Sequence, residues 1–268
     1  MSVKAAAGTS AEPVLLRHDD GGIARLTLNR PAQRNALSLE LIAALQIHVD
    51  AIARDAAVKV VVIAAAGPGF CAGHDLREMR ANPGRQHYER TFKACSDLML
   101  AITRLPKPVI ARVHGIATAA GCQLVATCDL AVASETARFA TPGVNIGLFC
   151  STPMVALTRA VGRKQAMEML LTGDLISAER AREAGLVNRV VPEAELDAAV
   201  EALARQIAGK SPLTLKIGKE AFCRQAELGL AEAYAYASEV MTRNMLARDA
   251  EEGIDAFLAK RPPHWEGR

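Results

Sequence analysis

The chain has 268 residues and half of them are hydrophobic, so it can bury the core of one large domain, with or without an appendage. The formal net charge is only +3, and Lys and Arg are scattered singly, which excludes the basic surface expected of a nucleic-acid-binding protein. No stretch of about eighteen consecutive apolar residues occurs, so no membrane span is predicted.

The cysteines and histidines form neither a disulfide pattern nor a metal-binding pattern. The six cysteines lack C-x-x-C spacing, and a chain of this length does not need disulfides, so we expect reduced thiols in a cytoplasm. The six histidines lie far apart, and no metal site is predicted. Residues 1–13 contain one lysine and no apolar stretch, so they are predicted to be a flexible tail and not a signal peptide.

The first part of the chain alternates strands with helices. Residues 14–18 and 23–28 flank Asp19-Asp20-Gly21-Gly22, which predicts a β-hairpin. Ser38 is the expected N-cap of an amphipathic helix, because apolar residues recur at helical spacing from Leu41 to Ile52. Further strands are predicted over 58–64, 109–113, 130–133 and 137–140, and further helices over 88–105 and 120–126.

Beyond about residue 150 only helical patterns are found. These helices are predicted over 153–161, 164–171, 179–184, 193–208, 212–226 and 230–247. Alternating strands and helices followed by a helical tail indicate an α/β core with appended helices. The predicted division is a tail over 1–13, a core over 14–200 and a C-terminal helical region over 201–268.

Two predicted strands end in loops of small residues. The strand "VKVVVIAAA" runs into "GPGFCAGHDL", whose G-x-G-x-x-x-G spacing and Pro68 disfavour a dinucleotide site. The strand "KPVIARV" runs into "HGIATAAGCQ", a second loop of Gly and Ala. Two such loops could point free backbone amides at one oxygen atom, which is the requirement for an oxyanion hole. The alternative for the loops is a tight turn that binds no ligand. The alternative for the whole protein is a nucleotide-dependent oxidoreductase.

Five segments, in order along the chain, resemble the enoyl-CoA hydratase/isomerase (crotonase) family. They are "LNRPAQRNALS", "GFCAGHDLREM", "KPVIARVHGIATAAGCQLVATCDLAVAS", "RAVGRKQAMEMLLTGDLISAERAREAGLVNRVV" and "EEGIDAFLAKRPP". The resemblance covers nearly the whole chain from Val14 onward. It implies an α/β fold of repeated ββα units, with C-terminal helices that mediate trimers, often paired into hexamers as dimers of trimers. It also implies an acyl-CoA thioester ligand, with coenzyme A as part of the substrate and no separate cofactor.

In this family two backbone amides bind the thioester oxygen and stabilise an enolate-like intermediate. The resemblance assigns these amides to His74 and Ala120. Ala120 stands where many members have glycine, and alanine adopts most of the same conformations unless φ is positive. We therefore expect the amide donor to be retained.

The hydratases of the family carry two glutamates, and the corresponding positions here are Gln123 and Gly143. A positioned acid or base contributes roughly 10² to 10⁴ in rate, so the loss of both predicts weak addition of water to an enoyl group. The candidate replacements are the His74 imidazole, Cys150 and Ser151. Cys150 could instead be a small apolar side chain that only packs in the core, and the His74 ring could instead only cover the site without taking part in the reaction.

The resemblance places coenzyme A on the loops "RPAQRNALS" and "CAGHDL" and on "AFLAK" of a neighbouring subunit. The expected contacts are Arg34, Ala36, Ala72, His74, Asp75, Leu76, Phe257 and Lys260. Arg30 is a second candidate for the phosphates, although exposed arginines are usually only solvated. Asp75 is expected to hold its loop by accepting backbone hydrogen bonds, and His114 to be structural.

The sequence therefore predicts a cytoplasmic, oligomeric acyl-CoA enzyme of the hydratase/isomerase type. One alternative is a binding or accessory protein of the same fold without turnover. Another is a different acyl-CoA reaction, such as isomerisation, thioester hydrolysis or decarboxylation. The acyl group is not defined, because its pocket depends on the loops around residues 80–95 and 143–152.

Overall fold

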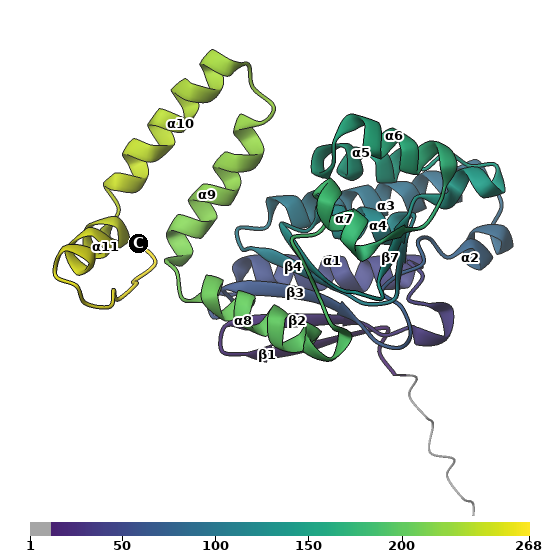
Figure 1. The fold of residues 1–268 in the computed structure, drawn as a ribbon, viewed down its shortest axis with the longest axis horizontal. Coiled ribbons are helices and arrows are strands. Elements are labelled where there is room, and N and C mark those ends of the chain that lie inside the picture. The colour runs from purple at the N-terminus through teal and green to yellow at the C-terminus, as the bar shows by residue number, and fades with distance from the viewer. Residues whose placement is uncertain (1–11) are drawn as a thin grey trace, which may run out of the picture.

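The computed structural model describes residues 12–268, so most of the predicted tail lies outside the described residues. It shows a sheet covered by helices on both faces and three further helices that extend away from it (Figure 1). The main sheet consists, in spatial order, of β1 (Leu15–Asp20), β2 (Ile23–Leu28), β3 (Val60–Ala65), β4 (Val109–Val113), β6 (Leu130–Ser134) and β9 (Arg189–Val191). Within this sheet, as described over residues 12–268, β1 and β2 pair antiparallel and the other neighbouring strands pair in parallel.

A second, smaller sheet lies at the carboxyl ends of the main strands. It contains β5 (Ile116–Thr118), β7 (Arg138–Ala140) and β8 (Ile176–Ser177). β5 and β7 run parallel, and β5 leads directly into α4 (Ala120–Thr127). This sheet therefore fixes the position of the N-terminus of α4.

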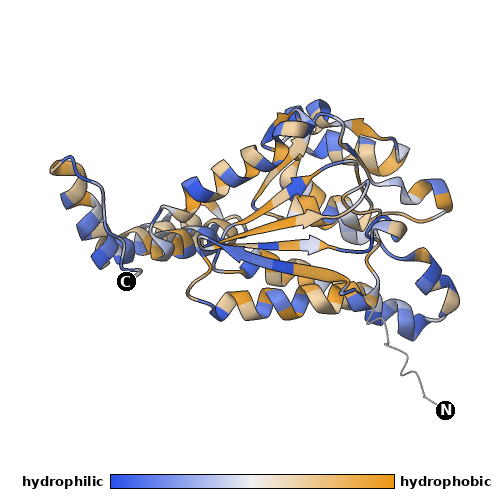
Figure 2. Cartoon of the chain, turned by 90° about the horizontal axis from the view of Figure 1, so that it is seen from below, coloured by the Kyte–Doolittle hydropathy of each residue, from blue (hydrophilic) through white to orange (hydrophobic). Residues whose placement is uncertain are grey.

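The helical layers follow from the alternation of side chains along the strands. Leu26 and Ile63 belong to the core beneath α1 and α3, whereas Ile23 and Val62 belong to the core beneath α8. In Figure 2 the apolar strands lie in the middle of the molecule, with helices of mixed hydropathy outside them. The helices around the sheets are α1 (Leu39–Arg54), α2 (Leu76–Ala81), α3 (Arg85–Arg104), α4, α5 (Ser151–Ala160), α6 (Arg163–Thr172), α7 (Ala178–Ala184) and α8 (Leu196–Ala208).

The predicted hairpin and the predicted helix cap are confirmed. β1 and β2 are joined through Gly21 and Gly22, whose φ angles of 55° and 83° give the left-handed turn that a tight hairpin requires. The Ser38 side chain accepts a hydrogen bond from the amide of Leu41 and so caps α1.

The prediction of only helices beyond residue 150 is wrong. β9 pairs in parallel with β6 and completes the main sheet, and β8 extends the small sheet. These strands have three and two residues and are partly exposed, so they give too short a pattern to recognise. α2, β5 and the last helix were also not predicted. The predicted boundary at residue 200 falls within α8 and stays a prediction.

The last three helices form an arm that projects from the core (Figure 1). They are α9 (Pro212–Gln225), α10 (Leu230–Met245) and α11 (Arg248–Leu258). The buried Lys219 ammonium of α9 anchors the arm, because it lies 2.6 Å from an Asp129 carboxylate oxygen and 3.0 Å from the carbonyl oxygen of Ile102. Within residues 12–268, no helix has the length and apolar composition needed to cross a bilayer.

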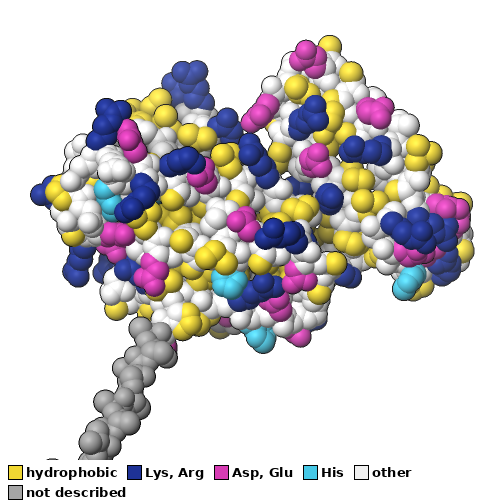
Figure 3. Space-filling view, turned by 180° about the vertical axis from the view of Figure 1, so that it is seen from behind, with side chains coloured by type: hydrophobic (Ala, Val, Ile, Leu, Met, Phe, Trp, Pro, Cys, Tyr) yellow, Lys and Arg dark blue, Asp and Glu magenta, His cyan; other side chains and the backbone are white. Residues whose placement is uncertain are grey.

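The arm exposes many large apolar side chains. Phe222, Leu230, Tyr234, Leu246 and Phe257 are all more than two-thirds exposed. Figure 3 shows the face opposite to that of Figure 1, where apolar side chains lie on both the core and the arm. Surfaces of this kind generally mark contacts with another macromolecule.

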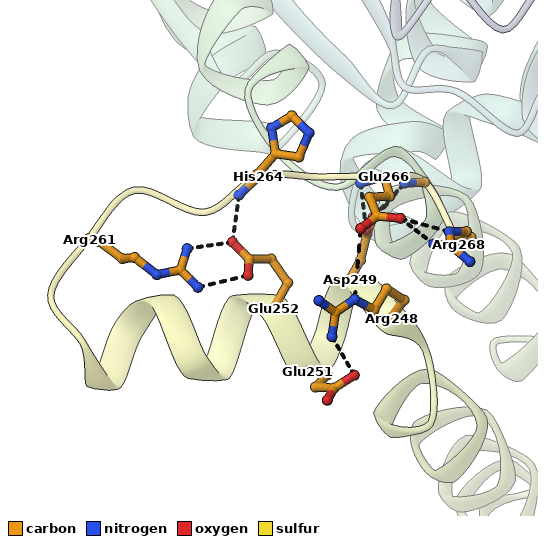
Figure 4. A network of polar contacts seen from close by, with 9 residues as sticks. Arg248, Asp249, Glu251, Glu252, Arg261, His264, Glu266 and Arg268 are labelled. Atoms are coloured by element: carbon orange, nitrogen blue, oxygen red, sulfur yellow. Dashed lines mark hydrogen bonds and ion pairs between the residues drawn. The ribbon is translucent and has the colours of Figure 1, made fainter.

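The residues after α11 fold back onto the arm around one buried carboxylate (Figure 4). Asp249 accepts hydrogen bonds from the Ser211 hydroxyl and from the backbone amides of Glu266 and Gly267. Burial acts to raise the pKa of Asp249, but these hydrogen bonds outweigh it and leave that pKa lowered. The carboxylate therefore holds three segments of the arm together.

We predict that Asp249→Ala lowers the free energy of unfolding by on the order of 2 kcal/mol at pH 7, because it leaves the buried Ser211 hydroxyl and two partly buried backbone amides without this acceptor. The folded-state pKa lies below the unfolded value of about 3.9, so this stabilisation is complete above that value and is lost as the pH falls through the lowered pKa. Urea unfolding at several pH values measures it. Asp255→Ala, on the exposed face of the same helix, is the control and should change little.

Candidate active site

The two loops of small residues lie against each other as one unit. The Cys71 amide donates to the carbonyl of Ile116 at 3.0 Å, and the Thr118 amide donates to the carbonyl of Cys71 at 2.9 Å. The Thr118 hydroxyl donates to the carbonyl of Ala72 at 3.1 Å. The loop after β3 is thus bonded along its length to β5, the strand that leads into α4.

Glycines allow the backbones of the two loops to approach closely. Gly73 has a φ of 98°, and a Cβ atom there would lie 2.8 Å from Ala119 Cβ and 3.3 Å from Ala120 N. A Cβ atom on Gly121 would lie 2.2 Å from the carbonyl oxygen of Cys71. Any side chain at either position would separate the loops. The amide of His74, which follows Gly73, is consequently held close to the start of α4.

The amides of His74 and Ala120 are unused donors. Within residues 12–268, neither donates a hydrogen bond to another protein group. Ala120 is the first residue of α4, so its amide has no partner in the helix and lies at the positive end of the helix dipole. The structure therefore brings together the two residues assigned to the oxyanion hole.

The strained residue of the second loop is Ala119 and not Ala120. Ala119 has φ 50° and ψ −119°, whereas Ala120 already belongs to the helix. The possibility of a positive φ, raised from the sequence for Ala120, therefore applies to the residue before it. A residue with a Cβ atom is disfavoured in the conformation of Ala119, which glycine adopts freely.

Two buried oxygen atoms near the start of α4 have no hydrogen-bond partner among the described residues. Gln123 is 4 % exposed and its Oε1 is unpaired; Thr141 is fully buried and its Oγ1 is unpaired. Thr141 directly follows β7, and the Ala119 amide donates to the carbonyl of Ala140 at 2.9 Å. Buried polar atoms normally have a partner, so these two oxygens are candidates for contact with a ligand. Thr141 is not among the residues predicted from the sequence; its available signal is a polar residue at the end of a buried strand.

Cys150 fills the space beside Gly143. A Cβ atom on Gly143 would lie 2.9 Å from Cys150 Sγ and 2.7 Å from the carbonyl oxygen of Leu148. The backbone of Gly143 is not left-handed, so space is what excludes a side chain there. Burial raises the pKa of the Cys150 thiol, although the Gly143 amide opposes this shift. Ser151 is exposed and begins α5.

The His74 imidazole contacts Phe92 of α3 edge to face, with ring centroids 5.4 Å apart. Both ring nitrogens are buried and unpaired among the described residues. Burial lowers the pKa of His74 and outweighs the opposing effect of the Leu37 carbonyl, which lies near the ring but outside hydrogen-bonding geometry, so the ring is neutral at pH 7. A neutral imidazole offers one donor and one acceptor for proton transfer.

The two loops expected to hold coenzyme A are also bonded to each other. The Ala72 amide donates to the carbonyl of Arg34 at 3.0 Å. Arg30 is engaged internally, since its guanidinium lies 2.9 Å from the Asp75 carboxylate, whereas Arg34 is exposed and available. The expectation that Asp75 accepts backbone hydrogen bonds is confirmed by its capping of α2.

Sequence analysis also missed Asn35, which is fully buried in the first of these loops and has a φ of 54°. Its amide nitrogen donates to the carbonyls of Ala66 and Gly69, and its side-chain oxygen accepts from the amide of Arg30. Asparagine tolerates the left-handed region better than other residues with a Cβ atom, which is the available signal. Ala36 is buried beside it, and Leu76 begins α2.

Phe257 and Lys260 are not brought to these loops within one chain. Phe257 is 81 % exposed near the end of α11, and Lys260 follows that helix. Figure 1 shows α11 at the opposite end of the molecule from α2. In the part of the chain that the structure describes, no three His, Cys, Asp or Glu side chains form a group that could hold a metal ion.

The sequence profile of the family described as Enoyl-CoA hydratase/isomerase matches residues 18–268. The chain therefore belongs to the enoyl-CoA hydratase/isomerase family, and its α/β fold with C-terminal helices is the crotonase fold.

Individual relatives match nearly the whole chain. Enoyl-CoA hydratase domain-containing protein 3, mitochondrial, from Rattus norvegicus is 47 % identical over 97 % of this chain and 87 % of its own length. The crystal structure of an enoyl-CoA hydratase from Mycobacterium smegmatis is 56 % identical, with a TM-score of 0.93, covering 95 % of this chain and 99 % of that one. The structure of human enoyl-CoA hydratase domain-containing protein 3 is 48 % identical, with a TM-score of 0.92 over 94 % of this chain and all of that one.

The expectation of a cytoplasmic protein is contradicted by this comparison. The rat, mouse, frog, human and zebrafish relatives, which are 47–50 % identical, are all named as mitochondrial proteins. The expectation rested on unpaired cysteines, and reduced thiols do not distinguish one reducing compartment from another.

We predict that Ala119→Gly raises the free energy of unfolding by about 1 kcal/mol, because glycine adopts the Ala119 backbone conformation without strain. Chemical denaturation measures the change. Ala117→Gly is the matched control two residues earlier, in β5, and should destabilise the protein. A destabilised Ala119→Gly variant would contradict the assignment of strain to this residue.

Proposed function

We propose that this protein is an enzyme of the hydratase/isomerase type that binds an acyl-CoA thioester and stabilises its enolate. The amides of His74 and Ala120 would bind the thioester oxygen. The observation that carries the proposal is the pair of unused amides, on two loops that are bonded to each other and that meet closely at Gly73.

The chemistry of a thioester enolate suits these donors. Removal of a proton from the α-carbon places negative charge on the thioester oxygen. Two fixed amides, one of them at the positive end of α4, stabilise this charge without reorganising. The donors contribute most in the transition state, where the oxygen carries more charge than in the bound substrate.

Water addition also needs an acid and a base, and the residues present here supply them poorly. Gln123 has no titratable proton, and Gly143 is crowded by Cys150. The neutral His74 imidazole, with both nitrogens unpaired among the described residues, is the side chain best suited to move a proton. We therefore expect weak conventional hydration, although some relatives carry hydratase names, including 2,3-dehydroadipyl-CoA hydratase from Escherichia coli at 38 % identity.

Two other functions stay open on specific observations. The crowded Gly143 and the raised pKa of Cys150 favour a binding or accessory protein without turnover. The free His74 imidazole favours a different acyl-CoA reaction, such as isomerisation, thioester hydrolysis or decarboxylation, with Cys150 or Ser151 as further candidates.

We propose further that the protein is a trimer or a dimer of trimers. The exposed apolar side chains of the arm support an oligomer, since they lack a covering in one chain. The same assembly would allow Phe257 and Lys260 to reach the coenzyme on a neighbouring subunit, together with Arg34, Ala36, Ala72, Asp75 and Leu76 of the loops.

Acetoacetyl-CoA, which enolises readily, is expected to bind more tightly than coenzyme A itself. Ala120→Pro removes one amide donor at a position where a helix accepts proline. This variant should lose affinity for acetoacetyl-CoA, or turnover where it is measurable, by on the order of 10²-fold while still binding coenzyme A. Isothermal titration with both ligands measures the loss. Unchanged acetoacetyl-CoA affinity in a folded variant would refute the oxyanion assignment, and binding of NAD without acyl-CoA binding would refute the family function.

Crotonyl-CoA hydration by the unmodified protein is expected to be at least roughly 10²-fold slower than that of a hydratase with both glutamates, assayed side by side. Gln123→Glu is nearly isosteric and should raise the rate. Gly143→Glu should mainly destabilise the fold, because its Cβ atom would overlap Leu148 and Cys150. Vigorous hydration by the unmodified protein would show that other residues carry the acid–base steps.

A further inference from the structure

His114 lies at the point where both loops leave the main sheet. It follows β4 and is 8 % exposed. Its Nδ1 lies 2.9 Å from a terminal nitrogen of Arg112, and its Nε2 lies 2.7 Å from the carbonyl oxygen of Gly67. The ring therefore connects the strand that leads to Ala120 with the loop that leads to His74.

The neighbours of the ring determine which nitrogen carries its proton. A guanidinium only donates hydrogen bonds, so Nδ1 must accept from Arg112. A carbonyl oxygen only accepts, so Nε2 must carry the proton and donate it to Gly67. Both contacts are satisfied together only by the neutral imidazole protonated on Nε2.

Arg112 is itself held in place by α8. Its Nε and one terminal nitrogen lie 2.9 Å and 2.8 Å from the two carboxylate oxygens of Asp197. This paired contact has fixed geometry, and Arg112 stabilises the ionised Asp197 so strongly that the pKa of Asp197 falls to about 2. Arg25, 3.0 Å from Asp197, and Glu193 are the other charged groups around the same cavity of about 420 Å³.

The two loops are in contact next to this ring. Gly115, the residue after His114, has a φ of 58°, and a Cβ atom there would lie 2.3 Å from the carbonyl oxygen of Pro68. Pro68 directly follows Gly67, so the bond from His114 fixes the loop at the turn where it first meets its neighbour. A displacement at this turn would propagate along the bonded loops toward His74 and Ala120.

We propose that His114, fixed as its Nε2-protonated tautomer by Arg112 and Asp197, is a positioning residue that sets the distance between the two oxyanion-hole amides. The proposal rests on the proposed function of those amides. It gives a role in the reaction to a residue that touches neither the thioester nor the reacting atoms.

The test compares three substitutions of His114. Glutamine can accept from Arg112 and still donate to Gly67, whereas asparagine is too short to reach Gly67 and leucine has no donor. The quantity measured is the ratio of the dissociation constants of coenzyme A and acetoacetyl-CoA, obtained by isothermal titration. This ratio reports the oxyanion hole, because partial unfolding lowers the binding of both ligands alike.

His114→Gln should keep the ratio within about threefold of the wild type, and His114→Asn and His114→Leu should lower it by about tenfold, less than the complete loss of one donor. His264→Asn, at an exposed histidine, is the control. If the leucine variant does not fold, the smaller polar asparagine variant carries the comparison. A wild-type ratio in the asparagine or leucine variant would overturn the proposed role of His114 and would leave the proposed function of the amides intact. A wild-type protein without preference for acetoacetyl-CoA would overturn the proposed function together with it.

Discussion

The candidate site depends on the close approach of two backbone segments that leave adjacent parallel strands. Gly73, Gly115 and Gly121 lie where any Cβ atom would meet the opposite loop at less than 3.0 Å. Because the approach is a matter of atomic size, it is not adjustable by side-chain rotation. The small sheet, the start of α4 and the turn after β3 all take their positions from this contact.

The chemistry of the site is correspondingly divided between backbone and side chains. In the proposed site, the amide donors of His74 and Ala120 would supply a fixed electrostatic environment, whereas Gln123, Thr141 and the His74 ring have polar atoms without internal partners among the described residues. The backbone part is rigid because it is bonded along its length. The side chains would therefore determine which reaction takes place at the site.

Much of the main sheet could be predicted from the sequence, because its central strands are continuous apolar runs and Ser38 and Gly21-Gly22 are strong local signals. The pairing of the two loops was expected from their position after parallel strands and from the family resemblance. The short strands β8 and β9 were missed because two or three residues carry no usable periodicity. The contacts of Asn35 and His114 could not be predicted because their partners, Ala66, Gly69 and Gly67, lie more than thirty residues away in the sequence. Thr141 has only a weak local signal, a polar residue at the end of a buried strand.

A binding site made from peptide groups has consequences for how such a protein can change over generations. Most codon changes at His74 or Ala120 replace a side chain and leave the amide donor in place, so the proposed thioester-binding function would survive most mutations there. Gln123 and Cys150 instead contribute through their side chains, so a single exchange there alters the side-chain chemistry of the candidate site directly. Proteins with this fold can therefore acquire new reactions on one class of ligand while they keep the ability to bind that ligand.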